Sequence, residues 1–163
     1  MTLAAFVLVL VTIQRFGELV LARRNTQRLL KMGAYEVGAR HYPLIVVLHA
    51  TWIAALWIFG HGSDVNLYWL FIFVILQIMR VWVIATLGIR WTTRIIILPG
   101  ARAVTTGPFR LIRHPNYAVV IGEIAVLPLA LGLPYVAAVF SLLNACVLTI
   151  RIKAENEAFA AAV

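Results

Sequence analysis

The chain has 163 residues, of which 63% are hydrophobic and only 12% are charged, and its mean hydropathy is +0.96. This composition excludes an ordinary soluble protein and predicts one membrane-embedded domain over residues 1–163. The formal net charge of +8 comes mainly from basic residues that flank apolar segments, which argues against nucleic acid as a partner and indicates membrane topology instead.

Five apolar segments of roughly membrane-spanning length predict an all-α, polytopic membrane protein. They cover residues 1–22, 43–60, 67–88, 117–133 and 135–150. Only Gly132, Leu133 and Pro134 separate the last two segments. This turn predicts a tight helical hairpin at the C-terminal end of the domain.

Basic residues are concentrated on alternate sides of these segments. They are Arg23, Arg24, Arg28, Lys31 and Arg40 before the second segment, Arg90, Arg94, Arg102, Arg110 and Arg113 before the fourth, and Arg151 and Lys153 after the fifth. The connections at residues 61–66 and 132–134 contain no Arg or Lys. The positive-inside rule therefore predicts an external N-terminus and a cytosolic C-terminus.

Several ionisable residues lie inside the apolar segments, where they are costly and often functional. Arg15, Glu18, His49, Arg80 and Glu123 are all predicted at similar depths, in the cytosolic half of the membrane. One interpretation is that Arg15 pairs with Glu18, and Arg80 with Glu123, only to neutralise buried charge. The alternative is that these groups line a polar cavity open to the cytosol.

The longest connection, residues 89–116, is of a length that is usually functional or disordered. Its apolar stretch 95–98 is expected to pack against the membrane surface or over a site. The segment 107–117 ends this connection, and its proline at position 115 predicts that the fourth helix begins near His114. The free backbone donors of that helix end, beside Arg113, favour a carboxylate or phosphate.

A stripe on the fifth helix turns polar toward its C-terminal end. Its members, spaced by three and four residues, are Ser141, Asn144, Leu148, Arg151 and Glu155. In an antiparallel hairpin this stripe can face residues 114–117 and form one cytosolic cofactor site. The combined arginine, carboxylate, imidazole and aromatic groups suit a zwitterionic nucleoside such as S-adenosylmethionine. Methyl transfer needs mainly alignment, so neither a covalent nucleophile nor a metal site is predicted.

At this point the sequence resembles the isoprenylcysteine carboxyl methyltransferases and their bacterial relatives. The resemblance covers residues 90–157. It is carried by Gly107-Pro108-Phe109, Arg113-His114-Pro115-Asn116-Tyr117, Leu127-Pro128-Leu129 and Arg151-Ile152-Lys153-Ala154-Glu155. Residues 36–43, with His49 after them, look more like a bacterial subgroup that includes alkylpyrone and alkylresorcinol O-methyltransferases. This resemblance implies a bacterial plasma-membrane enzyme.

The resemblance also implies roles for individual residues. The predicted cofactor-binding residues are Val104, Phe109, His114, Pro115, Asn116, Tyr117 and Glu155. Arg151 is expected to orient the acidic group of the acceptor and, with Arg113, is the predicted catalytic residue. Phe109 stands where a tyrosine is common in the family, so a hydrogen bond there is in doubt.

The predicted function is an S-adenosylmethionine-dependent O-methyltransferase. Its acceptor is expected to be a lipophilic molecule that enters from the bilayer, either an isoprenylcysteine-like carboxylate or an alkylpyrone or alkylresorcinol hydroxyl. One alternative is an NADPH-dependent membrane reductase, because sterol and enone reductases carry a similar Arg-His-Pro-x-Tyr segment. Another is a noncatalytic lipid-binding membrane protein whose buried charges serve packing.

Overall fold

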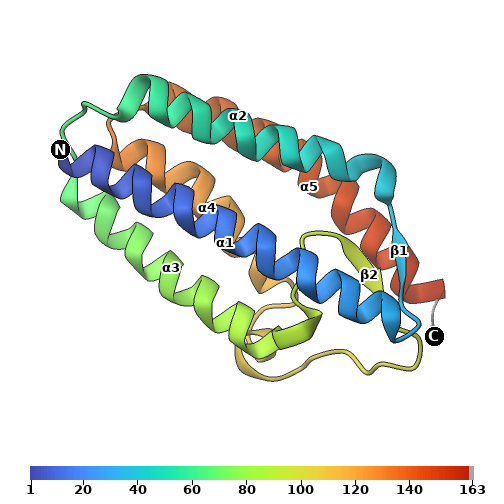
Figure 1. The fold of residues 1–163 in the computed structure, drawn as a ribbon. Coiled ribbons are helices and arrows are strands. Elements are labelled where there is room, and N and C mark those ends of the chain that lie inside the picture. Colours follow the sequence, from blue (N-terminus) through green and yellow to red (C-terminus); the bar gives the residue numbers. More distant parts are fainter. Residues whose placement is uncertain (162–163) are drawn as a thin grey trace.

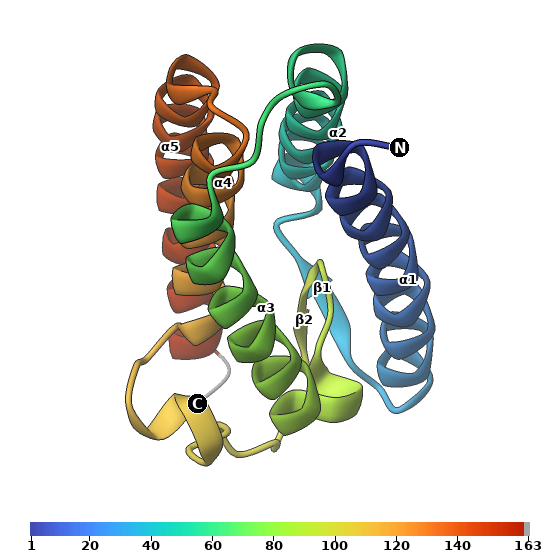
Figure 2. The same cartoon turned by 90° about the vertical axis from the view of Figure 1, so that its left-hand side faces the viewer.

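The computed structural model describes residues 1–161, which form five α-helices and two short strands (Figure 1). The helices are α1 (Leu3–Lys31), α2 (Tyr42–Gly60), α3 (Leu67–Leu87), α4 (Pro115–Ala130) and α5 (Pro134–Ala161), and the strands are β1 (Tyr35–Val37) and β2 (Ile95–Ile97). Helices α1 and α2 lie on one side of the bundle and α4 and α5 on the other, while α3 packs along α4 (Figure 2). The predicted all-α, polytopic architecture is confirmed.

Four of the described helices are long and apolar enough to cross a membrane, namely α1, α2, α3 and α5. Their outer faces carry many exposed large apolar side chains, including Phe16 on α1, Ile58 on α2 and Leu142 on α5. Such surfaces are unfavourable in water and suit contact with lipid chains. The protein is therefore an integral membrane protein.

Helix α4 differs from the predicted fourth span at residues 117–133, because it has only 16 residues and ends at Ala130. At about 1.5 Å per residue it is shorter than a typical hydrocarbon core. Glu123, Ile124, Leu127 and other α4 residues are buried against the surrounding helices. A helix enclosed by protein need not match the bilayer thickness.

Two helices extend beyond their predicted spans. Helix α1 continues from residue 22 to Lys31, so Arg23, Arg24 and Arg28 lie on a helix and not in a loop. Asn25 fixes this extension because its side-chain amide donates to the carbonyls of Gly88, at 3.1 Å, and Trp91, at 2.8 Å. Helix α5 likewise continues past residue 150, as the polar stripe predicted.

A small antiparallel sheet was not predicted from the sequence. Its register pairs Tyr35 with Ile97 and Val37 with Ile95, which joins the two long connections at one end of the bundle. Ile95 and Ile97 are buried against Ala158 of α5. The apolar stretch in the second connection is therefore strand β2, covered by α5. Three-residue strands carry almost no periodic signal, which explains why pattern alone misses them.

The opposite end of the bundle holds the N-terminus and the two connections without Arg or Lys (Figure 1). Thr2 caps α1 by accepting a hydrogen bond from the Ala5 amide, and its hydroxyl donates to the His61 carbonyl at 2.6 Å. The Asn66 amide donates to the Ala130 carbonyl at 2.8 Å. These contacts tie α1 to α2 and α3 to α4 at the end of the bundle opposite the sheet.

Candidate active site

The start of α4 and the last third of α5 meet at Tyr117. The Tyr117 hydroxyl donates a hydrogen bond to Glu155 Oε2 and accepts one of 3.0 Å from Arg151 Nε. Arg151 and Glu155 are four residues apart and share one face of α5, which lets a single tyrosine reach both. These three side chains are called the Tyr117 relay below. The predicted facing of residues 114–117 and the α5 stripe is thus confirmed at Tyr117.

Arg151 is fixed by two hydrogen bonds and retains a free donor. Its Nη1 donates to the backbone carbonyl of Thr93 at 2.8 Å, in addition to the bond from Nε to Tyr117. Its Nη2 bonds to none of the residues that the structure describes. The Thr93 hydroxyl in turn lies 3.2 Å from the hydroxyl of Tyr42 on α2. Thr93 acts through a backbone oxygen, so no side-chain pattern could have predicted its contact.

The other residues at the start of α4 surround this relay. Helix α4 begins with Pro115 at its first position, after His114, as the sequence predicted. The His114 ring stacks on Tyr117, with 5.4 Å between ring centres. Asn116 Oδ1 accepts a hydrogen bond of 3.4 Å from Trp91 Nε1. His114, Asn116 and the relay therefore form one polar and aromatic group at this helix end.

Three predicted site residues lie elsewhere. Phe109 packs with Ala22, Val83 and Trp91 in a small apolar cluster between α1 and α3. Val104 is half-buried in the connection before α4, and the Arg113 side chain is exposed. Among the described residues, neither Val104 nor Arg113 forms a side-chain hydrogen bond or ion pair with the relay, so their predicted roles in binding and catalysis stay predictions.

A cavity of about 430 Å³ lies beside the relay, within the size range of small-molecule sites. Side chains from all five helices and from residues 91–93 line it. Those used below are Arg15, Phe16, Glu18 and Leu19 of α1, Tyr42, Val46 and His49 of α2, Arg80 of α3, Asn116 of α4, and Asn144, Leu148 and Arg151 of α5. Asn144, Leu148 and Arg151 belong to the predicted stripe, which therefore forms one wall of the cavity.

Deeper in the bundle, the ionisable residues of the apolar segments form one network. Arg80 donates to Glu123 through Nε, at 2.6 Å, and through Nη2, while its Nη1 lies 3.1 Å from Glu18. Arg15 donates to Glu18 at 2.7 Å and to Glu123 at 2.8 Å. Arg15, Glu18, Arg80 and Glu123 are called the four-charge cluster below. Both predicted ion pairs are confirmed, and each arginine also bonds the other carboxylate.

The four-charge cluster is almost closed on itself. All four carboxylate oxygens accept hydrogen bonds, with Gln14 and Gln77 supplying the bonds that the arginines do not. Among the described side chains, Arg15 Nε is the one buried cluster atom without a partner. Gln14 precedes its partner Glu18 by one helical turn, a spacing that could have predicted this bond, whereas Gln77 bonds Glu123 of another helix.

The two interpretations of these buried charges are both partly correct. Glu123 and Arg80 have side chains only 1% and 4% exposed and are neutralised by their partners. Arg15, Glu18 and Arg80 nevertheless line the same cavity as Asn116, at the start of α4, and Arg151, near the end of α5. The cluster is therefore neutral as a whole and also forms a polar part of the cavity wall.

Comparisons with known proteins place this arrangement in context. Residues 69–161 match the model of the isoprenylcysteine carboxyl methyltransferase (ICMT) family. An uncharacterised protein of Bacillus subtilis, YpbQ, is 38% identical over 151 residues, which is 90% of each chain. An uncharacterised protein of Haemophilus influenzae is 31% identical over 153 residues, covering 88% of this chain and 87% of the relative. No solved structure matches the chain at a significant level.

Proposed function

The chain belongs to the isoprenylcysteine carboxyl methyltransferase family, and from that premise we propose that it is an S-adenosylmethionine-dependent O-methyltransferase with a lipophilic acceptor. The family is one of membrane methyltransferases. The single observation that supports the proposal most is the Tyr117 relay, whose Arg151 lines the cavity. Its residues come from the two parts of the chain that carry the family's motifs.

The residues around the relay fit S-adenosylmethionine by their chemistry. The free Nη2 of Arg151 suits a carboxylate, and Glu155 suits an ammonium or a ribose hydroxyl. His114 and Tyr117 offer stacked aromatic surface for adenine. When bound, the cofactor supplies a methyl group on a sulfonium sulfur. The chain's own contribution is to hold both reactants, exclude water and neutralise charge on the acceptor.

The rim of the cavity supports a lipophilic acceptor. Phe16 and Leu19 of α1 and Val46 of α2 line the cavity and are also exposed on the apolar outside of the bundle. An alkyl or prenyl chain can therefore extend between α1 and α2 into the bilayer while the polar head group enters the cavity. Membrane lipids would surround this rim, and nucleic acid has no part in the proposal.

The proposed orientation places the relay at the cytosolic face, where the cofactor is synthesised. The sheet, the basic C-terminal part of α1 and residues 89–114 all lie at the relay's end of the bundle (Figure 1). The opposite end has connections without Arg or Lys. This distribution supports an external N-terminus and a cytosolic C-terminus.

The decisive test uses purified protein in lipid nanodiscs. Methyl-labelled S-adenosylmethionine is supplied with a prenylated cysteine, an alkylpyrone or an alkylresorcinol, and Arg151→Ala is compared with wild type. Loss of a charge-assisted contact worth about 1.5–3 kcal/mol predicts a fall of about 10- to 100-fold. Lys153→Ala is the matched control because Lys153 is an exposed base two residues away on the same helix. Equal transfer by Arg151→Ala and wild type would contradict the assigned role.

Ligand binding separates this proposal from the alternatives. S-adenosylhomocysteine at about 100 times its dissociation constant is expected to stabilise the folded protein by about 2.7 kcal/mol, which raises its unfolding temperature. NADPH is expected to have no effect. Stabilisation by NADPH alone would indicate a reductase, and stabilisation by neither would leave a noncatalytic protein.

A further inference from the structure

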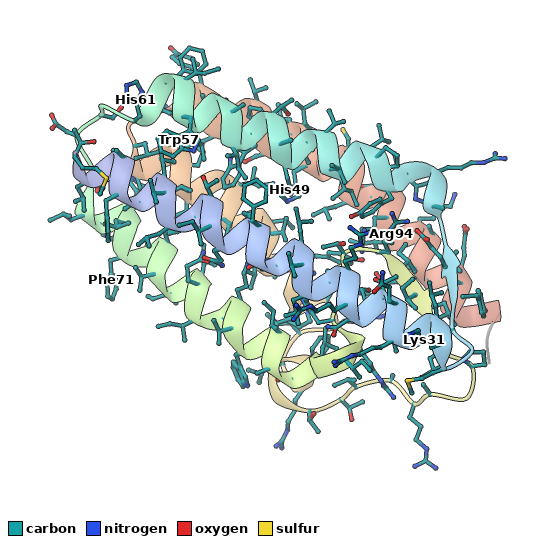
Figure 3. The ribbon with its side chains drawn as sticks, viewed as in Figure 1. Lys31, His49, Trp57, His61, Phe71 and Arg94 are labelled. Atoms are coloured by element: carbon teal, nitrogen blue, oxygen red, sulfur yellow. The ribbon has the colours of Figure 1, made fainter. Side chains whose placement is uncertain are left out.

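His49 is the one histidine that lines the cavity, among the residues that the structure describes. It lies on α2 and projects toward α1 (Figure 3). Tyr42, Ile45 and His49 are spaced by three and four residues and therefore share the face of α2 that borders the cavity. Tyr42 touches Thr93, which holds Arg151, so the same cavity connects His49 with the relay.

The hydrogen bond of His49 determines which ring nitrogen is free. His49 Nδ1 lies 2.9 Å from the carbonyl oxygen of Ile45. A carbonyl oxygen only accepts, so Nδ1 must carry the hydrogen. In the neutral ring Nε2 then has a lone pair and no hydrogen. Nε2 makes no hydrogen bond to any residue that the structure describes.

None of the described charged groups around this face of α2 forms a hydrogen bond or ion pair with the His49 ring. They are Arg15 and Glu18 of α1, Arg80 of α3, Glu123 of α4 and Arg151 of α5, with Tyr42 as the other titratable group on α2. Both carboxylates are already held by the arginines of the four-charge cluster. No described carboxylate is therefore left to pair with the ring, and Nε2 remains available to a ligand.

Asn144 of α5 is a second polar group at a depth in the bundle similar to that of His49. Asn144 lies two turns before Arg151 on α5, is only 2% exposed, and lines the cavity. Its side-chain amide forms no hydrogen bond with the described residues, and its polar atoms are not among the fully enclosed ones without a partner, so the amide reaches the cavity. A buried asparagine and a histidine lone pair facing one space predict a ligand with both donor and acceptor groups.

Resting on the proposed methyl transfer, and on the hydroxyl-bearing class of acceptor named there, we propose that His49 is the general base that takes the proton from a phenolic hydroxyl. A phenol hydroxyl donates to Nε2, and a second oxygen on the ring can bond Asn144. A carboxylate has only acceptor atoms and would meet the Nε2 lone pair unfavourably. It is also already deprotonated near neutral pH and needs no base.

The reaction balances with these groups. The phenol O–H bond breaks and its proton moves to His49 Nε2, giving an imidazolium. The oxygen electron pair forms the new O–CH3 bond as the S–CH3 bond breaks, and that bond's electron pair stays on sulfur. The products are the methyl ether and S-adenosylhomocysteine, and the imidazolium loses its proton to water.

The test measures methyl transfer to 5-pentadecylresorcinol and to N-acetyl-S-farnesylcysteine in nanodiscs. His49→Gln keeps an amide that can bond the Ile45 carbonyl but cannot accept a proton. It is expected to lower transfer to the resorcinol by about 10²- to 10⁴-fold at pH 7. The deficit should shrink as pH rises toward the phenol pKa of about 10, because phenolate then forms without a base.

His61→Gln is the matched control. His61 ends α2 and makes the same type of bond, from Nδ1 to the Trp57 carbonyl at 2.9 Å, but it is exposed and does not line the cavity. It is expected to match wild type. A His49→Gln deficit that is equal at every pH, or no deficit, would overturn the assignment.

Two measurements distinguish failure of this inference from failure of the proposed function. Thermal stabilisation by S-adenosylhomocysteine must persist in His49→Gln, which shows that the variant is folded. Wild-type protein that binds this ligand and methylates only the farnesylcysteine would contradict both the phenolic acceptor and the role of His49 as general base. The proposed methyl transfer itself would still stand, and no variant is needed for this result. Wild-type protein that neither binds the ligand nor transfers a methyl group would overturn both proposals.

Discussion

The four-charge cluster joins arginines to glutamates between helices, whereas the Tyr117 relay links Arg151 and Glu155 of α5 through a tyrosine of α4. The two groups also use their hydrogen-bonding atoms differently. In the cluster, Arg15, Arg80 and two glutamines satisfy all the oxygens of Glu18 and Glu123. In the relay, Arg151 keeps an Nη2 that bonds to none of the described residues, and Arg151 lines the cavity. A closed network contributes mainly to the fold, whereas an open one can bind a ligand.

The largest expected effect is the loss of stability when Glu123 is removed from the four-charge cluster. Glu123→Ala leaves Arg15 and Arg80 with uncompensated buried charge, which is expected to cost about 3–5 kcal/mol of folding free energy. The measurement is reversible unfolding in detergent, compared with Glu157→Ala, which removes an exposed glutamate of α5. A loss no greater than that of Glu157→Ala would show that the cluster is not a structural unit.

A double-mutant cycle measures how strongly Arg15 and Glu18 are coupled within the cluster. Arg15→Met and Glu18→Leu each remove one charge of the cluster, whereas the double variant leaves the neutral pair of Arg80 and Glu123. The double variant is therefore expected to lose less stability than the sum of the single losses, by about 0.5–3 kcal/mol. Strictly additive losses would mean that the two side chains are not coupled.

A change in the Tyr117 relay is expected to reduce methyl transfer more than stability. Tyr117→Phe removes the hydroxyl that connects Arg151 to Glu155, while the ring that stacks on His114 remains. Loss of contacts to charged groups predicts about a tenfold fall in methyl transfer. The free energy of unfolding should fall by about 1 kcal/mol, much less than for Glu123→Ala. A large stability loss with normal transfer would assign the relay to the fold instead.

The smallest effect is expected for an ion pair near the surface. Arg94 lies 2.7 Å from Glu36 beside the sheet, and the two side chains are 38% and 23% exposed (Figure 3). Such pairs contribute about 0–1 kcal/mol because water screens them. Glu36→Gln should therefore barely change the unfolding temperature, and raising the salt concentration should reduce its effect further. A loss comparable to that of Glu123→Ala would break the distinction between enclosed and exposed pairs.

Part of the site could be predicted because its signals are local. The proline after His114 marks the start of α4, and the spacing of Asn144, Leu148, Arg151 and Glu155 marks one face of α5. An antiparallel hairpin then has few ways to pack, so Tyr117 was expected near this face. The ion pairs could be predicted because isolated charges inside apolar segments need partners.

Other features depend on segments that are far apart in the chain. Strand pairing between residues 35–37 and 95–97, the bond from Arg151 to the Thr93 carbonyl, and the burial of α4 have no local signal. The positions of Val104 and Arg113 outside the relay also depend on the course of the long connection, whose residues 107–110 pack against α3. Local periodicity reports which face of a helix is apolar, but it does not report which backbone atom lies opposite.

The amino-acid sequence alone was enough to predict that the protein spans a membrane with helices, that its basic residues gather at one end, and that the last two helices carry the family's motifs. Hydropathy and spacing suffice because lipid requires every spanning segment to satisfy its backbone internally. The folded structure was needed to show that α4 is largely buried, that the buried charges form one neutral network, and that His49, Asn144 and Arg151 share a cavity. These depend on the packing of five helices, which no single segment encodes.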